Sequence, residues 1–202
     1  MAEKHEKNTG RLSGKVAIIS GAAAADGAVG IGAATAKLFA REGARVLLVN
    51  RTEAHAQQLR DDIVSEGGEC AVFIGDVTLE TDVQRMVESA ISIYGQIDIL
   101  HNNAGVGAPG TVVNVEQSVW DNAMKTNLQA TMLTCKYSIP HMIASGGGSI
   151  INTSTVGAVQ GFRRGDIGFA AYSASKAGLI GLTLSIAADY AADGIRANSL
   201  IA

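Results

Sequence analysis

Short apolar runs alternate with stretches of helical period along most of this 202-residue chain. Each run ends at a glycine or a polar residue, and short bounded apolar runs are typical of strands that are buried on both faces. Strands that alternate with helices form β-α-β units, so the sequence predicts a parallel α/β sheet with helices on both faces. The predicted strands lie near residues 16–19, 45–50, 71–74, 97–100, 149–153 and 195–200.

The helices between the strands are expected to turn an apolar side toward the sheet. The first helix should end at Gly43, with Ile31, Thr35, Leu38 and Phe39 on its inward side. The inward positions expected for the next two helices are Ala56, Leu59 and Ile63, and then Val83, Met86, Val87 and Ala90.

Local signals predict where the later helices begin and end. Thr81 and Gln84 have the spacing of a capping box, which would begin a helix that ends at Gly95. A long helix is predicted over about 116–144, and another begins near Tyr172.

The composition fits a single soluble domain. Apolar residues make up 47% of the chain and charged residues 17%, which excludes an intrinsically disordered protein. The formal net charge of −3 provides no basic surface for nucleic acid. Cys70 and Cys135 are too few for a disulfide framework and suit a reducing compartment. No stretch resembles a signal peptide or a membrane span, so a cytoplasmic protein without a membrane partner is expected.

A glycine-rich turn follows the first predicted strand directly. Glycine lets the backbone approach a phosphate closely, and the free N–H groups at a helix N-terminus favour its negative charge. Ordinary turns use glycine as well, but the first β-α turn of a doubly wound sheet is where dinucleotides bind. Gly21, Gly30, Ile31 and Gly32 are therefore predicted to contact a dinucleotide.

The end of the second strand is expected to select the ribose of that cofactor. An acidic residue there binds the ribose hydroxyls of NAD, whereas a cation accommodates the 2′-phosphate of NADP. This chain has Asn50 and Arg51 at that position, so the sequence favours NADP over NAD. The alternative is that Arg51 lies on a solvated loop while Asn50 binds the ribose.

Tyr172 and Lys176 lie four residues apart in the segment YSASK, so a helix places them on one face. A neighbouring ammonium stabilises a phenolate, which helps a tyrosine to move a proton to or from an alcohol or ketone oxygen. The same pair is common on ordinary helix surfaces, so its meaning depends on the motifs around it.

Four segments together resemble the short-chain dehydrogenase/reductase family, of the classical type. They are the glycine-rich turn, HNNAG at 101–105, GGSIINTST at 147–155 and YSASKAG at 172–178. Their order and spacing extend the resemblance over about 12–202. It implies a Rossmann-type doubly wound sheet in three layers, and an oxidoreductase that transfers a hydride between NAD(P) and a ketone or secondary alcohol.

The resemblance also implies roles for single residues. Tyr172 would be the catalytic acid and base, and Lys176 its electrostatic partner and a ligand of the nicotinamide ribose. Asn127 would hold a water molecule that relays protons to Lys176. The other cofactor contacts implied are Asp76 and Val77 near the adenine, Arg51 at the 2′-phosphate, and Asn103, Ala104 and Gly105 along the cofactor.

The catalytic hydroxyl departs from the family pattern. The position that usually holds a serine is Thr155 here, and Ser154 precedes it. A threonine hydroxyl donates and accepts hydrogen bonds too, but its methyl group adds bulk and restricts χ1. Thr155 is predicted to polarise the substrate oxygen, with Ser154 as the alternative.

Three segments differ from the pattern in length. The turn between Gly21 and Gly30 is longer than usual, and its extra residues are expected to bulge outward. The glycine-rich loop 157–168 is also longer, and its Arg163 and Arg164 would favour an anionic substrate unless they are only solvated. The C-terminal part of the family fold is absent, so this is either a partial chain or a protein with an open substrate pocket.

The sequence therefore predicts an NAD(P)-dependent oxidoreductase in one domain, 11–202, after a disordered polar tail, 1–10. The alternative is a protein that binds NAD(P) without turnover, as a sensor or an assembly subunit. An enoyl reductase fits less well, because the Tyr–Lys spacing matches carbonyl chemistry. The substrate is expected to be a small carbonyl or alcohol compound.

Two further expectations concern metals and assembly. The histidines and cysteines have no ligand spacing, so no metal site is predicted, and His101 is expected to be a packed residue without a catalytic role. The helix over 116–144 and the helix that begins near Tyr172 resemble those that pair family members into homodimers and homotetramers.

Overall fold

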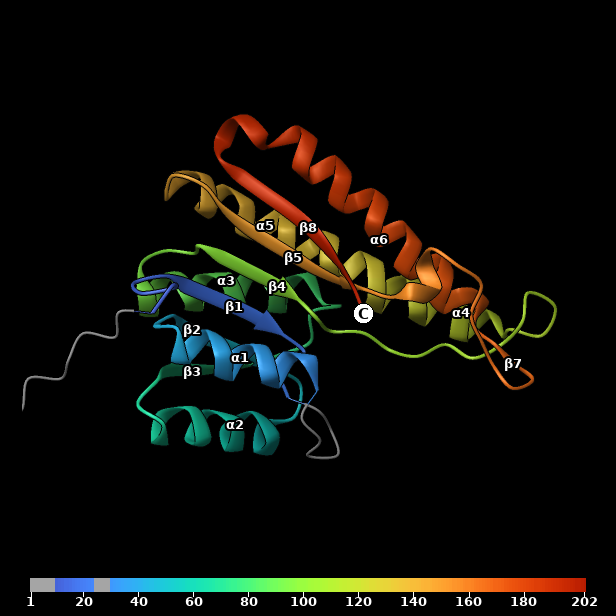
Figure 1. Ribbon diagram of the computed structural model, residues 1–202, viewed down its shortest axis with the longest axis horizontal. Coiled ribbons are helices and arrows are strands. Elements are labelled where there is room, and N and C mark those ends of the chain that lie inside the picture. The colour runs from blue at the N-terminus through green and yellow to red at the C-terminus, as the bar shows by residue number, and fades with distance from the viewer. Residues whose placement is uncertain (1–9, 24–29) are drawn as a thin grey trace, which may run out of the picture.

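The computed structural model describes residues 10–23 and 30–202. Six parallel strands form one sheet in the order β3-β2-β1-β4-β5-β8 (Figure 1). Because β1 lies between β2 and β4, the chain reverses its direction across the sheet there, which confirms the predicted doubly wound topology. The strands are β1 Val16–Ser20, β2 Arg45–Asn50, β3 Glu69–Ile74, β4 Ile99–Asn102, β5 Gly148–Ser154 and β8 Ile195–Ile201.

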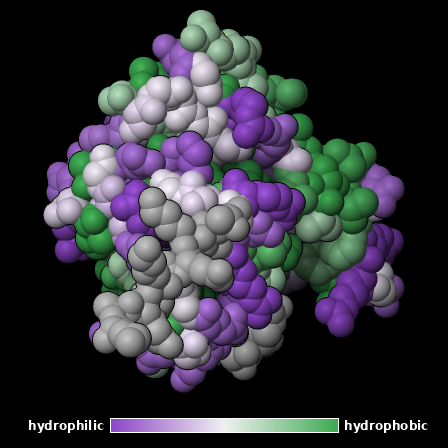
Figure 2. Space-filling view, turned by 60° about the vertical axis from the view of Figure 1, so that its left-hand side comes forward, coloured by the Kyte–Doolittle hydropathy of each residue, from purple (hydrophilic) through white to green (hydrophobic). Residues whose placement is uncertain are grey.

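Helices cover both faces of the sheet and give the predicted three layers (Figure 1). On one face lie α1 (Ile31–Arg41) and α2 (Glu53–Ser65). The other face is covered by three longer helices, α3 Glu80–Tyr94, α5 Ala130–Ala144 and α6 Ala170–Asp189. None of the helices in the described ranges combines the length and the apolar character needed to span a membrane. On the face that Figure 2 shows, hydrophobic residues gather mainly at the right-hand side.

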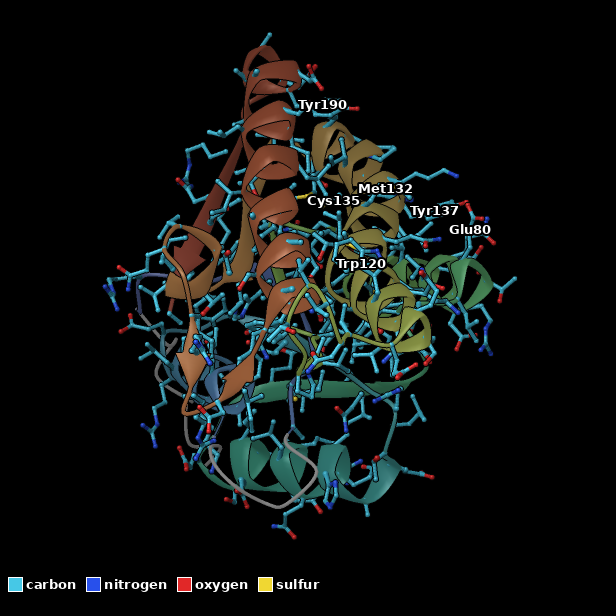
Figure 3. The ribbon with its side chains drawn as sticks, turned by 90° about the vertical axis from the view of Figure 1, so that its right-hand side faces the viewer. Glu80, Trp120, Met132, Cys135, Tyr137 and Tyr190 are labelled. Carbon is cyan, nitrogen blue, oxygen red and sulfur yellow. The ribbon has the colours of Figure 1, made fainter. Side chains whose placement is uncertain are left out.

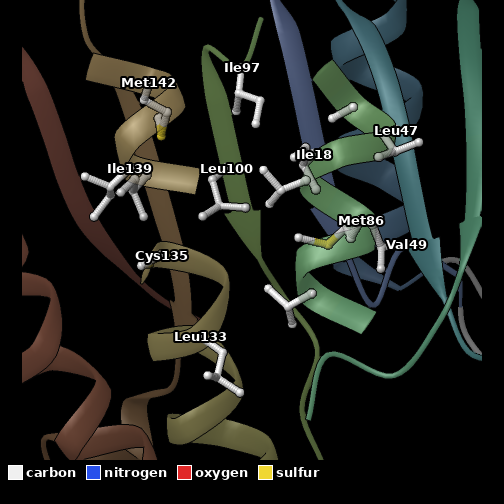
Figure 4. Packing of buried hydrophobic residues seen from close by; sticks show 14 of the residues in the cluster. Ile18, Leu47, Val49, Met86, Ile97, Leu100, Leu133, Cys135, Ile139 and Met142 are labelled. Atoms are coloured by element: carbon white, nitrogen blue, oxygen red, sulfur yellow. The ribbon is translucent and has the colours of Figure 1, made fainter. Parts of the chain in front are cut away.

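The larger apolar core lies between the sheet and the helices α3 and α5. Ile18 of β1 and Leu100 of β4 are fully buried there, and they belong to one cluster with Met86 of α3 and Ile139 of α5 (Figure 4). Every residue of β1 is buried, as expected for a central parallel strand. This packing fixes the strand ends, where the polar side chains of the site begin.

The inward side of α1 differs from the prediction. The buried residues are Gly32, Ala33, Ala36 and Ala40, whereas Ile31 and Leu38 are 40% and 48% exposed. Small side chains let the helix lie close to the sheet, and the larger apolar residues are left at its edges. The inward positions predicted for α2 and α3 are confirmed.

The capping box predicted at Thr81 and Gln84 is wrong. Helix α3 begins at Glu80, and its N-cap residue, Leu79, makes no side-chain capping bond. The helix start is stabilised instead by Glu80 and Asp82 in the first turn, whose negative charges interact favourably with the positive end of the helix dipole. The predicted end is confirmed, because Gly95 takes the left-handed conformation, with φ +81°.

Two segments are more structured than the sequence suggested. The helix predicted over 116–144 consists of α4 (Gln117–Ala123), a π-helix (Met124–Gln129) and α5. The predicted loop 157–168 contains an antiparallel hairpin of β6 (Arg163–Arg164) and β7 (Ile167–Gly168). It also includes most of a 3₁₀ turn that precedes the hairpin. Both segments border the site described next.

Candidate active site

Two adjoining clefts lie along the carboxyl ends of the central strands. The first, of about 310 Å³, is lined by residues that follow β1, β2, β3 and β4. The second, of about 300 Å³, lies between β5 and the start of α6. Asn103, Gly105 and Val106 line both clefts, so together they form one groove from Arg51 to Tyr172. The predicted site residues that line it are Gly21, Ile31, Asn50, Arg51, Asp76, Val77, Asn103, Ala104, Gly105, Ser154, Thr155, Tyr172 and Lys176.

Three predicted site residues lie beside the described lining, and two of them belong to the glycine-rich turn. Gly30 precedes α1 as its N-cap residue. A Cβ on Gly32 would overlap the carbonyl oxygen of Gly21, and it would lie 2.8 Å from Nδ2 of Asn103. That Nδ2 donates a hydrogen bond to the same Gly21 oxygen over 2.9 Å. The glycines thus let α1, the end of β1 and the loop after β4 meet closely.

The turn fits the phosphates of a dinucleotide. Gly21 has φ +61°, a conformation that favours glycine, and it lines the groove with backbone rather than side chain. The helix that follows presents its N-terminus on the same side, since Ile31 lines the second cleft. The expected outward bulge concerns residues 22–29, and 24–29 lie outside the described residues.

Replacing Gly32 by alanine is expected to lower the free energy of unfolding by about 1–3 kcal/mol, because the added methyl group overpacks the contact with Gly21. Gly181 of α6 is a matched control, since a Cβ there would meet nothing within 4 Å. The Gly181→Ala variant should gain about 0.5–1 kcal/mol from helix propensity. Urea unfolding measures both, and equal effects would contradict the close approach at Gly32.

The end of β2 carries a cation and no acid. Arg51 is exposed, and no described residue forms an ion pair with it. Asn50 uses its amide to donate to the carbonyl oxygen of Thr52 over 3.0 Å. Arg51 is therefore available to an anion.

The loop at Asp76, after β3, is anchored to the start of α3. The main-chain amide of Asp76 donates a hydrogen bond to the Asp82 carboxylate. This bond and a second one from Arg85 hold the pKa of Asp82 below its usual range.

Lys176 is buried at the far end of the groove. It is 4% exposed, and its Nζ donates to the main-chain oxygen of Thr153 over 2.7 Å. Burial lowers the pKa of Lys176 to about 8. Helix α6 places Tyr172 one turn earlier, and both side chains line the second cleft. The helix therefore brings a phenol and a buried ammonium to one small space.

The two candidate hydroxyl groups have different environments. Ser154 is 2% exposed, and its Oγ donates to the main-chain oxygen of Lys176 over 3.0 Å. The Thr155 Oγ1 accepts a long bond of 3.4 Å from the main-chain amide of Gly157. The proton of Thr155 is not used in that bond, and the residue lines the cleft. Thr155 is thus the hydroxyl that remains available to a bound oxygen.

Asn127 lies in the π-helix and is fully buried. Its Oδ1 accepts from the main-chain amide of Val106 over 2.7 Å, and its Nδ2 donates to the Val106 oxygen and to the Ser175 hydroxyl, each over 3.0 Å. Asn127 therefore ties the loop after β4 to helix α6 between Tyr172 and Lys176. π-Helical turns frequently occur at functional sites.

Sequence reasoning missed several residues of the site. The main-chain oxygen of Thr153 accepts the hydrogen bond of Lys176, and a main-chain group cannot be recognised from the type of side chain in the sequence. Phe162 and Phe169 flank the hairpin and line the second cleft, and the available signal was an aromatic residue within the predicted loop and another directly after it. Arg163 and Arg164 are exposed on the hairpin and are not among the described lining residues, so the cleft gives the anionic-substrate hypothesis no support.

His101 is a packed residue, as expected. It is 1% exposed, and its Nε2 lies 3.0 Å from Oγ1 of Thr153. Burial lowers the pKa of His101 to about 4, so the ring is neutral at physiological pH. Among the described residues, no group of three or more His, Cys, Asp or Glu side chains is placed to hold a metal ion.

Comparison with known proteins agrees with this geometry. The family model for short chain dehydrogenases matches residues 15–202. The uncharacterized oxidoreductase YxbG of Bacillus subtilis is 40% identical over 95% of this chain and 67% of its own length. The 7alpha-hydroxysteroid dehydrogenase of Clostridium sardiniense is 38% identical over 95% of this chain and 71% of its own length.

A solved structure has the same fold. It is the crystal structure of a putative short-chain dehydrogenase/reductase from Burkholderia xenovorans, 35% identical, with a TM-score of 0.90 over 95% of this chain and 75% of that one. The groove, the glycine-rich turn and the Tyr172–Lys176 pair lie within the matched range. This chain belongs to the short-chain dehydrogenase/reductase family.

Proposed function

We propose that this protein is an NAD(P)-dependent oxidoreductase that interconverts a ketone and a secondary alcohol. One observation carries the proposal: a single groove joins the cleft at Arg51 to the cleft that holds Thr155, Tyr172 and Lys176. A dinucleotide lying in that groove would present one end to the polar cluster. The relative named as a hydroxysteroid dehydrogenase supports alcohol and ketone chemistry.

The residues of the second cleft have complementary roles in this reaction. Bound NAD(P)H would supply the hydride to the carbonyl carbon. As negative charge develops on the substrate oxygen, Tyr172 gives it the hydroxyl proton, and the Thr155 hydroxyl donates a hydrogen bond to the same oxygen. The ammonium of Lys176 stabilises the phenolate that remains. Oxidation of the alcohol runs through the same steps in reverse.

Asn127 and Lys176 are proposed to return the proton to Tyr172. The Asn127 Oδ1 and the Lys176 Nζ lie 3.2 and 3.3 Å from the point where a Cβ on Gly105 would stand. Both atoms therefore lie close to Gly105, and a water molecule bound by both would connect them. Asn127 also positions the site, because its amide group bonds to Val106 and Ser175.

We propose NADP as the preferred cofactor, with NAD as the alternative. Replacing Arg51 by alanine is expected to weaken NADPH binding about tenfold or more, because this is the loss in affinity that corresponds to one arginine–phosphate hydrogen bond. NADH lacks the 2′-phosphate and should be affected much less. Fluorescence titration of both cofactors tests this, with Arg60→Ala on the exposed side of α2 as the control. Equal losses for NADPH and NADH would contradict the assignment of Arg51.

A homodimer or homotetramer is proposed on the strength of the surface formed by α5 and α6. The two helices lie side by side, with Met132, Cys135 and Tyr190 along them (Figure 3). A groove of about 400 Å³ between them is lined largely by apolar residues, and Met132 at its side is 38% exposed. Light scattering should give a mass above 20.8 kDa, and Met132→Glu should lower it. An equal effect of Val64→Glu on α2 would contradict this location.

The free thiols Cys70 and Cys135 support a reducing compartment, and the cytoplasm is the location proposed. The domain proposed, 11–202, combines the cofactor groove and the catalytic side chains on one sheet.

A further inference from the structure

The second cleft is lined by both polar and apolar side chains. Thr155 and Tyr172 contribute hydroxyl groups. Phe162 and Phe169 contribute apolar rings, and they belong to the hairpin segment rather than to the sheet. Small-molecule sites are commonly built this way, with apolar walls and a few polar groups that fix orientation.

The hairpin places the two rings opposite each other. Its register pairs Arg163 with Gly168 and Arg164 with Ile167, so the next cross-strand pair is Phe162 and Phe169. The ring centroids are 5.0 Å apart. The Phe169 ring also meets the Tyr172 ring edge-on, at 6.5 Å. The three rings therefore form a row that ends at Tyr172, the proposed proton donor.

The loops around the hairpin hold this row in place. The main-chain amide of Gly110 donates to the Gly168 oxygen over 2.8 Å, and Ala170 donates to the Gly110 oxygen over 2.9 Å. On the other side, a Cβ on Gly157 would stand only 3.0 Å from the Cβ of Phe162, so the backbone lies directly against this residue. Phe169 is thus fixed from both sides, and Phe162 packs on a glycine.

The Phe162 ring nevertheless keeps an open side. Phe162 is 40% exposed, although it lines a cleft and contacts the tilted ring of Phe169. An apolar surface of this kind next to a reacting centre is available to the part of the substrate that adjoins the carbonyl group.

We propose, resting on the proposed function, that Phe162 and Phe169 determine specificity by binding a flat ring system next to the substrate carbonyl. A ketone oxygen between Thr155 and Tyr172 directs its neighbouring atoms along the row of rings. A fused bicyclic ketone reaches both phenylalanines, whereas a short acyclic ketone is too small to cover them. The substrate class is therefore cyclic, apolar ketones and the corresponding alcohols.

The test compares the binding of 2-tetralone and 2-pentanone by ligand-observed NMR titration, with and without excess NADP⁺. The wild-type protein should bind 2-tetralone about tenfold more tightly or better, the scale of discrimination by an apolar pocket. Phe162→Leu and Phe169→Leu should each reduce that ratio, and the double variant should nearly abolish it. Phe39→Leu on α1, far along the chain from the hairpin, is the matched control.

Each outcome bears on the proposal separately from the proposed function. A ratio near one in the wild type, no detectable binding of either ketone, or an unchanged ratio in the double variant overturns it. A ratio that depends on the phenylalanines supports it, even if no NADPH is oxidised, and in that case the proposed function fails alone. Phe162→Leu keeps the test valid if Phe169→Leu does not fold, because Phe162 is partly exposed.

Discussion

Replacing Tyr172 by phenylalanine is expected to lower kcat for ketone reduction by about 10²–10⁴-fold, the usual contribution of a positioned proton donor. The ring that remains keeps its edge-on contact with Phe169, so the free energy of unfolding should change little. The loss should fall on kcat, because the hydroxyl proton is needed as charge develops in the transition state rather than in the bound ketone.

Tyr190 provides a control for this variant. It follows α6 as its C-cap residue, at the opposite end of the helix from Tyr172, and it lines the α5–α6 groove. Tyr190→Phe should therefore retain the wild-type kcat. A Tyr172→Phe variant with the wild-type kcat would show that the phenol is not the proton donor, whatever the effect on KM.

The replacement of Lys176 by methionine is expected to abolish most activity and to stabilise the fold. Burial lowers the pKa of Lys176 to about 8, and a shift of this size costs the folded state about 3 kcal/mol when the amine is charged. Methionine leaves the Thr153 oxygen without the Lys176 donor, which costs about 1–3 kcal/mol. Methionine fills a similar space without charge, so the free energy of unfolding at pH 7 should rise by about 1 kcal/mol.

The pH dependence of stability isolates this contribution. Between the folded pKa of about 8 and the unfolded value of 10.5, the unfolded chain binds the Lys176 proton while the folded protein has lost it. The wild type therefore gains stability from this group as the pH rises through that window, and the cost is fully present below it. Lys176→Met should lack the gain, so its advantage should shrink between pH 7.5 and 10 in urea unfolding experiments. A variant less stable than the wild type at pH 7 would contradict a costly buried ammonium.

The topology of the sheet was predictable because central parallel strands are buried on both faces. Such strands leave continuous apolar runs, as in Val16–Ser20 and Arg45–Asn50. The inward side of α1 was not predictable in the same way, since Ala33 and Ala36 pack closely and carry little hydrophobic signal. The spacing of Thr81 and Gln84 does not determine which residue takes the N-cap conformation, and in the structure that residue is Leu79.

In the candidate site too, some features could be predicted from the sequence and others could not. Helical spacing places Tyr172 and Lys176 on one face, the motifs around them gave the pair its meaning, and the structure brings both to one cleft. The difference between Ser154 and Thr155 depends on a bond to a main-chain oxygen of α6, which no local pattern reveals. The π-helix around Asn127 packs against α6, which is distant in the sequence, and no local pattern predicted it.

The aromatic row shows what long-range pairing adds. Phe162 and Phe169 are seven positions apart in the chain, and only the register of the hairpin sets them opposite each other. The loop prediction for 157–168 had no means of placing them beside Tyr172.

The most direct test of the account is the transfer of deuterium from NADPH labelled at C4 of the nicotinamide to a ketone. The purified chain is incubated with each labelled C4 epimer and 2-tetralone, and the alcohol is analysed by mass spectrometry. The account predicts one deuterium on the carbinol carbon from one epimer, and a loss of this product in Tyr172→Phe. Binding of NADPH and ketone without any deuterated alcohol would show a protein that binds its cofactor but performs no hydride transfer.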